Sequence, residues 1–252
     1  MSFFKSEADG FATKSSRLEV FMLTMKKNKS ADVRGVKHGT LSKMELFKTL
    51  PFEALQEIEK QVNEKKYVRR EYIFMQDDPA EYVWFVKEGH VTIANHSKDG
   101  RSLTLSVNGP GKMFGFLAMG GGEYGVYSTA ETDATVISIP SQVFMNLMDK
   151  FSDVGKAVLF DLSDRLRQSK TMHVYAQETA KKRILNVLLK LFDEFGSRIP
   201  MTRKEIAEMA GISVETCIRI FTRLEEGGLI ESHNRGFAVH NPHGLRVHME
   251  EI

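Results

Sequence analysis

The spacing of apolar residues changes along this 252-residue chain and divides it into four parts. Residues 1–40 show little sustained periodicity and an excess of lysine and arginine, so we predict a flexible, mildly basic N-terminal extension. Residues 41–140 combine helical spacing at their start with strand-like runs. Residues 141–178 return to helical spacing, and residues 179–252 alternate short helical and strand-like stretches. This order predicts an α+β protein in which a long helix connects two folded domains.

The second part, residues 41–140, is predicted to form an antiparallel β-roll of the jelly-roll type with flanking helices. Its start has helical spacing around Leu50-Pro51, which predicts two short helices. Glycine-containing turns then separate short strand-like runs, as is typical of antiparallel rolls. Ser97-Lys98-Asp99-Gly100 predicts the turn of a hairpin that joins residues 91–95 to residues 103–107.

The third part, residues 141–178, predicts one continuous helix, because it contains no proline and only Gly155 interrupts its pattern. Six positions follow the spacing of a coiled-coil seam: Leu159, Leu162, Leu166, Ser169, His173 and Ala176. This seam predicts that two copies of the helix pair in a homodimer, firmly in the leucine half and weakly in the other half. The alternative is that the stripe only covers the roll of its own chain.

The last part predicts a winged helix-turn-helix. Thr202 and Glu205 have the spacing of a capping box, and Ser213 with Thr216 three residues later marks the start of a second helix. Gly211 between them permits the sharp turn of a helix-turn-helix. Two strand-like runs after this helix predict the hairpin that forms the wing.

The helix over residues 213–226 has the polarity expected of a DNA-reading helix. A stripe of four residues is predicted to be buried, namely Cys217, Ile220, Phe221 and Leu224. On the outer face, Arg219 is placed to pair with guanine and Glu215 with cytosine, although a plain Glu–Arg surface pair is the alternative. The predicted DNA-binding residues are Thr202, Arg203, Ser213, Val214, Glu215, Thr216, Ile218, Arg219, Arg223 and Arg235.

These motifs together resemble the CRP/FNR superfamily of bacterial transcription regulators. Gly89-His90-Val91 through Asp99-Gly100, followed by Gly111 to Gly115, is similar to the cyclic-nucleotide-binding-like sensor roll of that family. VETCIRIFTRLEEGGLI is similar to its recognition helix and wing, and the resemblance spans residues 41–245 approximately. It implies a homodimer, paired through the long helix, that binds a palindromic site in double-stranded DNA and has RNA polymerase as a candidate partner.

The resemblance also implies which bases are read. Glu215 and Arg219 match the Glu-x-x-x-Arg pattern of the family, which implies half-sites with a TGA core. Val214 is similar to the FNR branch, whereas the CRP branch has arginine there. Ile218 departs from the serine of FNR proteins, so the outer bases of the half-site stay open.

The sensor cassette implied by the resemblance, Phe114 to Ala130, lacks the groups that hold a cyclic nucleotide. Phe116 stands where the family has a ribose-binding glutamate, and Tyr124 with Gly125 stands where it has the phosphate-binding Arg-Ser pair. No lysine or arginine occurs from Met113 to Asp149, so a buried phosphate has no charged partner there. We therefore expect an effector other than cyclic AMP.

An apolar effector or haem suits this cassette better. The predicted effector pocket consists of Phe114, Phe116, Leu117, Met119, Tyr124, Val126 and Tyr127 with Ser169 and His173 of the long helix. His90, His96 and His173 are the candidate axial ligands of a haem, although no histidines show ligand spacing. The alternative is a filled roll that binds nothing and serves as a dimer scaffold for a ligand-independent DNA-binding regulator.

Composition excludes several other classes of protein. The only cysteine, Cys217, rules out an iron–sulfur cluster or a disulfide framework and suits a reducing cytoplasm. No apolar run approaches the roughly 20 residues of a membrane span, so we expect no membrane association. His90 and His96 have no third metal-ligating residue at a suitable spacing, which argues against a metal-dependent cupin-type enzyme. We therefore predict no catalytic site. The net charge of +2 decides nothing about nucleic acid.

Overall fold

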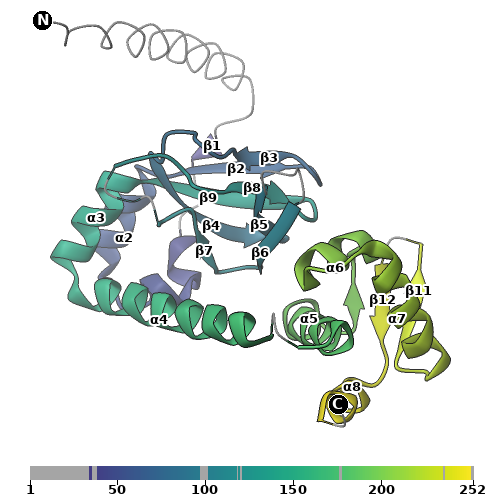
Figure 1. Cartoon of the computed structure of the whole chain (residues 1–252). Coiled ribbons are helices and arrows are strands. Elements are labelled where there is room, and N and C mark those ends of the chain that lie inside the picture. The colour runs from purple at the N-terminus through teal and green to yellow at the C-terminus, as the bar shows by residue number, and fades with distance from the viewer. Residues whose placement is uncertain are drawn as a thin grey trace, which may run out of the picture.

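The structure confirms the predicted α+β class. The computed structural model describes residues 34–35, 39–96, 102–117, 119, 121–175, 178–234 and 236–250. A β-roll lies beside a smaller C-terminal domain, and a long helix passes along the roll toward that domain (Figure 1). Within the described ranges, no helix has both the length and the apolar content needed to cross a membrane.

Two antiparallel sheets form the roll. Its strands are β1 (Arg34–Gly35), β2 (Asn63–Tyr67), β3 (Tyr72–Phe74), β4 (Tyr82–Glu88), β5 (Val91–His96), β6 (Ser102–Asn108), β7 (Met113–Phe114), β8 (Tyr127–Ala130) and β9 (Ala134–Pro140). One sheet has the order β1-β2-β9-β4-β7 and the other the order β3-β8-β5-β6. The predicted hairpin is confirmed, since β5 pairs with β6 and Val91 lies opposite Asn108, but its turn lies outside the described residues.

The prediction of two short helices around Leu50-Pro51 is wrong in its first half. Two 3₁₀ turns, η1 (Leu41–Lys43) and η2 (Glu45–Phe47), precede a single α-helix, α2 (Phe52–Glu59). Leu41, Met44, Phe47 and Leu50 are all buried. Their period of three residues matches the three residues per turn of a 3₁₀-helix rather than the 3.6 of an α-helix.

The prediction of one continuous helix over residues 141–178 is also wrong. Helix α3 (Ser141–Lys150) ends at Phe151, whose extended backbone (φ −124°, ψ 95°) separates it from α4 (Ser152–Tyr175). Phe151 packs against the same core as Phe144 of α3 and Val154 of α4. The break lets both helices pack against the roll. No proline or glycine at this position predicts it from the sequence.

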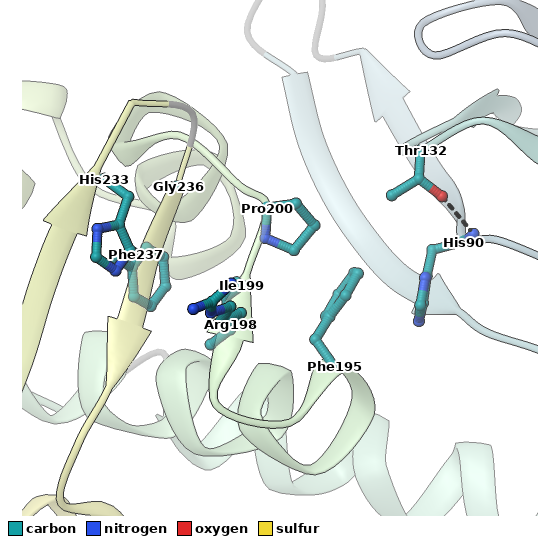
Figure 2. A pocket seen from close by; sticks show the side chains of 9 residues that line it. All are labelled: His90, Thr132, Phe195, Arg198, Ile199, Pro200, His233, Gly236 and Phe237. Carbon is teal, nitrogen blue, oxygen red and sulfur yellow. Dashed lines mark hydrogen bonds between the residues drawn. The ribbon is translucent and has the colours of Figure 1, made fainter.

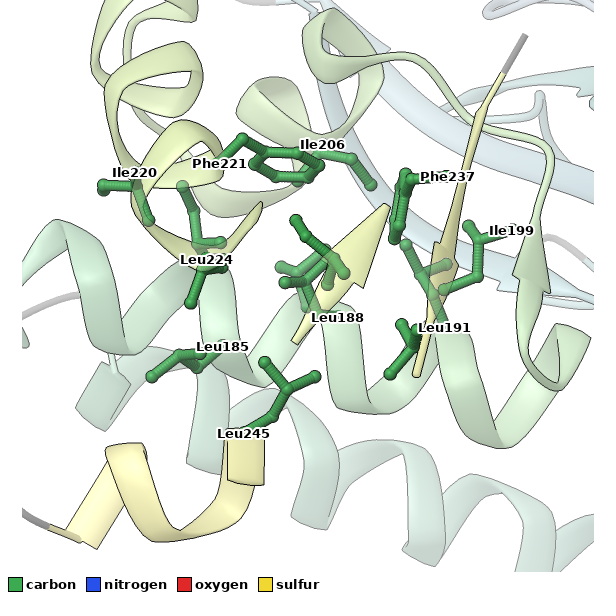
Figure 3. Close-up of a cluster of buried hydrophobic side chains, with 14 of the residues drawn as sticks. Leu185, Leu188, Leu191, Ile199, Ile206, Ile220, Phe221, Leu224, Phe237 and Leu245 are labelled. Carbon is green, nitrogen blue, oxygen red and sulfur yellow. The ribbon is translucent and has the colours of Figure 1, made fainter. Parts of the chain in front are cut away.

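Four helices and a small sheet form the described part of the C-terminal domain. Its elements are α5 (Ala180–Phe195), β10 (Arg198–Ile199), α6 (Arg203–Ala210), α7 (Val214–Glu226), β11 (Ile230–His233), β12 (Gly236–Val239) and α8 (Pro242–Glu250), with the sheet order β10-β12-β11. Leu188, Phe221 and Phe237 meet in its centre (Figure 3). The closing helix α8 carries no clear signal in the sequence, yet its Leu245 is fully buried in this core.

Candidate nucleic-acid interface and sensor roll

The helix-turn-helix begins with the capping box expected from the sequence. The backbone N–H of Glu205 donates to Oγ1 of Thr202 (3.3 Å), and the backbone N–H of Thr202 donates to Oε2 of Glu205 (2.6 Å). These two bonds satisfy free N–H groups at the start of α6. Gly211 ends the helix in the left-handed region (φ 60°, ψ 44°), where glycine carries no side-chain penalty.

The apolar stripe of helix α7 packs into the core of the C-terminal domain. Ser213 accepts a hydrogen bond from the backbone N–H of Thr216 (3.2 Å) and so caps the helix. All four residues predicted to be buried are buried, and Cys217 and Phe221 are completely so. Phe221 packs edge-on against Phe237 at 5.2 Å between ring centroids. The core therefore determines which face of α7 points to solvent.

The outward face of α7 presents polar groups that have no partner in the described part of the protein. Glu215, Arg219 and Arg223 are exposed, and Glu215 and Arg219 form no ion pair or hydrogen bond with any residue that the structure describes. The alternative of a plain Glu–Arg surface pair is thus not formed. Ile218 is 46% exposed beside them, an apolar side chain placed in water. This combination suits a face that contacts base edges.

Two predicted contact residues are placed differently from the others. Val214 packs partly against the domain core rather than standing free on the outer face. The guanidinium of Arg203 donates to Glu225 (3.1 Å) and to Oγ of Ser232 (2.7 Å), so it joins the two ends of the module internally. Arg235 lies outside the described residues.

The long helix α4 has one face on the roll and one apolar face in solvent. Leu159 is 63% exposed and Leu166 is 59% exposed, whereas Leu162, the seam residue between them, packs against the roll core. Phe160, which the heptad pattern omits, is 69% exposed next to Leu159. The side chains of Ser169 and His173 and the whole of Ala176 lie outside the described part. The exposed seam is therefore Leu159, Phe160 and Leu166.

The aromatic side chains of the sensor cassette pack against aromatic residues on other strands of the roll. Phe114, Phe116, Tyr124 and Tyr127 are buried, while Leu117 is 83% exposed and Met119 and Val126 are intermediate. Tyr124 stacks on Phe74 with 3.8 Å between centroids. Its hydroxyl accepts from Nε1 of Trp84 (2.9 Å) and donates to the carbonyl of Tyr82 (2.7 Å). The phenol is thus satisfied within the roll.

The Arg165 side chain of the long helix α4 brings a positive charge to the cassette. The sequence of the cassette alone does not predict this contact. The Arg165 guanidinium lies 5.2 Å from the centre of the Phe116 ring and donates to the carbonyl of Met113. Asp161 pairs with it at 2.6 Å. This cation–π contact holds α4 against the cassette, and the charge is already matched by protein groups.

The described residues give little support to a haem or metal in the roll. His90 is stacked on Phe195 of α5 with 3.9 Å between ring centroids, at the boundary with the other domain rather than in the cassette. The side chains of His96 and His173 lie outside the described residues. Across the described ranges, no three His, Cys, Asp or Glu side chains gather in a way that would hold a metal ion.

A cluster of charges joins the roll to the C-terminal domain. Arg69 donates to Glu131 of the roll (3.2 Å) and to the carbonyl of Pro200 (3.1 Å), and it lies 3.6 Å from Glu205, the capping residue of α6. Burial and then the nearby Glu205 carboxylate raise the pKa of Glu131 from 4.5 to about 7. They outweigh the hydrogen bond from Thr92 and the charge of Arg69, which lower it.

The raised pKa of Glu131 predicts a pH-dependent stability. Between pH 4.5 and about 7 the folded protein keeps a proton that the unfolded chain has lost. The free energy of unfolding should therefore fall as the pH rises through this window, by about 1–3 kcal/mol from this residue. Urea unfolding at pH 5 and pH 8 measures the fall, which should shrink in Glu131→Gln and persist in the exposed control Glu226→Gln. Equal falls in Glu131→Gln and the parent would contradict the assignment.

A capped helix-turn-helix with an outward polar face, joined through a long helix to a roll, defines a transcription regulator with a sensor domain rather than an enzyme. Comparison with known families agrees: the family described as "Cyclic nucleotide-binding domain" matches residues 64–151, and "Crp-like helix-turn-helix domain" matches residues 182–247. The chain belongs to the CRP/FNR superfamily of DNA-binding transcription regulators.

Known relatives are similar over most of their length. The Global nitrogen regulator of Synechocystis sp. is 27% identical over 189 residues, which are 70% of this chain and 84% of that protein. The nitrogen fixation regulation protein FixK of Rhizobium meliloti is 28% identical, over 69% of this chain and 81% of that protein. The solved structure of FixK2 from Bradyrhizobium japonicum superposes with a TM-score of 0.67 at 24% identity, over 74% of this chain and 96% of that one. This likeness supports the fold.

Proposed function

We propose that the protein is a homodimeric regulator that reads inverted TGA-type half-sites through the outer face of α7, under the control of a small apolar effector in the roll. The observation that carries the DNA-reading part is the pair Glu215 and Arg219, exposed on a rigid helix without partners among the described residues. Arginine can donate two hydrogen bonds to guanine, and glutamate can accept one from cytosine.

Backbone contacts would complement this reading. Thr202 and Ser213 stand at the first turns of α6 and α7, where helix N-termini favour phosphate oxygens. Thr216 and Arg223 border the same face. Arg203 is a weaker candidate, because it would have to leave Glu225 and Ser232 to reach a phosphate. Arg235 stays a prediction for the wing.

Two copies of the helix are needed to read a palindrome. The exposed seam of α4 offers three large apolar side chains for pairing, and helical pairing of this kind is favoured when such residues recur on one face. A productive dimer should place its two α7 helices about 34 Å apart, one turn of DNA. We propose a homodimer because homodimers are typical of the family.

The packing of the cassette favours a second candidate for the role of the roll. Phe116 and Tyr124 occupy the positions that hold a cyclic nucleotide in the family, and Tyr124 already has both hydrogen bonds of its hydroxyl filled. A ligand there must displace this aromatic packing. A roll that acts only as a dimer scaffold, with ligand-independent DNA binding, is therefore the alternative.

Removing the Arg219 guanidinium tests the reading face. Fluorescence anisotropy on a duplex with two inverted TGA half-sites, against a scrambled duplex, should show a loss of roughly 1–3 kcal/mol for Arg219→Ala on the TGA duplex. The variant should also discriminate less than the parent against replacement of one G·C pair of the half-site, because the bidentate contact reads that pair. All measurements share one salt concentration, since nonspecific affinity depends on it.

Arg223→Ala is the matched control, because it removes the same charge from the same helix. Loss of a phosphate contact weakens binding about equally on all sequences. An Arg219→Ala variant that behaved in this uniform way would contradict base reading. Binding by the purified protein without additions would favour the scaffold alternative, unless a small molecule extracted from the protein proves necessary.

A further inference from the structure

A cavity lies between the roll and the C-terminal domain, away from the sensor cassette. It has a volume of about 500 Å³, within the range of about 300–1,000 Å³ that is usual for small-molecule sites. His90 and Thr132 of the roll line it together with Phe195, Pro200 and Phe237 of the C-terminal domain (Figure 2). Both domains therefore contribute walls to one hollow.

The walls of this cavity suit a flat apolar molecule. Ile199 and Phe237 are almost completely buried and form its floor with Pro200. The His90 and Phe195 rings stack at 3.9 Å with 26° between their planes, so the cavity already holds one planar stack. Aromatic faces of this kind favour offset stacking with a further ring.

Two side chains at the rim of the cavity lack partners among the described residues, and both can donate hydrogen bonds. Arg198 and His233 line the rim, and neither forms an ion pair or hydrogen bond through its side chain with the described residues. Nε2 of His90 is buried without a hydrogen bond, and the nearest carboxylate oxygen, on Glu194, is 3.7 Å away. Because that nitrogen is enclosed, the donors that a ligand can reach are the Arg198 guanidinium and the His233 ring.

We propose that this cavity binds a small planar aromatic acid, with the ring between the apolar walls and the carboxylate at Arg198. This cavity is separate from the predicted effector pocket in the cassette. Its ligand binding does not depend on whether α7 reads DNA. A ligand that touches both domains binds best when they are docked as described, so it would favour this arrangement over any other. The contacts of Arg69 with Pro200 and Glu205 make the start of α6 part of this docking.

The test uses 1-naphthoate as probe and the full-length protein. Anisotropy of the naphthoate fluorescence should show saturable binding with a dissociation constant on the order of 0.1–1 mM. Arg198→Gln should weaken this binding about tenfold, because it removes one charge-assisted hydrogen bond. Arg246→Gln, which removes an exposed charge from α8, should leave it unchanged. Uncharged 1-naphthamide should bind both variants equally.

A second measurement locates the probe without relying on a variant. Nuclear Overhauser contacts from naphthoate to the methyl groups of Ile199 and Thr132 would support the site. Contacts to Val126 of the cassette alone, equal affinity in Arg198→Gln and Arg246→Gln, or no saturation up to about 10 mM would each overturn it. DNA takes no part in either measurement, so failure of the reading face would leave these results untouched.

Discussion

The double substitution Leu159→Glu and Leu166→Glu is expected to separate the two copies and to lower affinity for a two-half-site duplex by about 100-fold or more. Both leucines are more than half exposed on α4 and lie outside the roll core, so their replacement should leave the roll folded. Charges facing each other across a helix pair oppose association. A monomer then binds one half-site and loses the gain from linkage.

Sedimentation and anisotropy measure the two parts of this prediction. The control is a double substitution that places the same charges elsewhere on the roll, Val68→Glu with Met75→Glu, both at exposed apolar positions. It should remain a dimer with full affinity. A seam variant that stayed dimeric and kept the affinity of the parent would show that α4 is not the interface.

Phe221→Ala is expected to lower the free energy of unfolding of the C-terminal domain by about 3–5 kcal/mol. The ring is completely buried behind α7, in edge contact with Phe237, and Arg203 lies 5.7 Å from its centre. Its removal leaves a cavity under the reading helix. DNA affinity should fall as a consequence of the lost support, on all sequences alike.

Hydrogen exchange of the amides of α5 and α7 measures the free energy of unfolding of the C-terminal domain separately from the roll. Core amides are suited to this because they exchange only when the domain unfolds. Thr222→Ala on the solvent side of the same helix is the control and should change stability by less than about 0.5 kcal/mol. Unchanged protection of α7 in Phe221→Ala would mean that the core holds the helix through other residues.

The helix-turn-helix could be predicted closely because its signals are local. The cap residues Thr202 and Ser213, the turn at Gly211 and the stripe of α7 each depend on neighbours within a few positions. Local spacing determines which residues share a helix face. The structure accordingly places Cys217 and Phe221 in the core as predicted.

Features that depend on distant partners could not be predicted. Arg165 reaches Phe116 from a different element of the roll, and Arg203 pairs with Glu225 across the helix-turn-helix module. The break at Phe151 is set by packing of that ring on the roll rather than by a helix-breaking residue. The exposure of Phe160 has the same origin, because the position of the roll decides which face of α4 is covered.

Burial of Cys217 has a consequence for oxidative conditions. The thiol is completely enclosed behind α7, and burial raises its pKa to about 11, so almost no thiolate exists at neutral pH. Oxidants attack the thiolate, and the chain has no other cysteine with which to form a bond. If peroxide changes the output of this regulator, the signal must enter through an atom other than the cysteine sulfur.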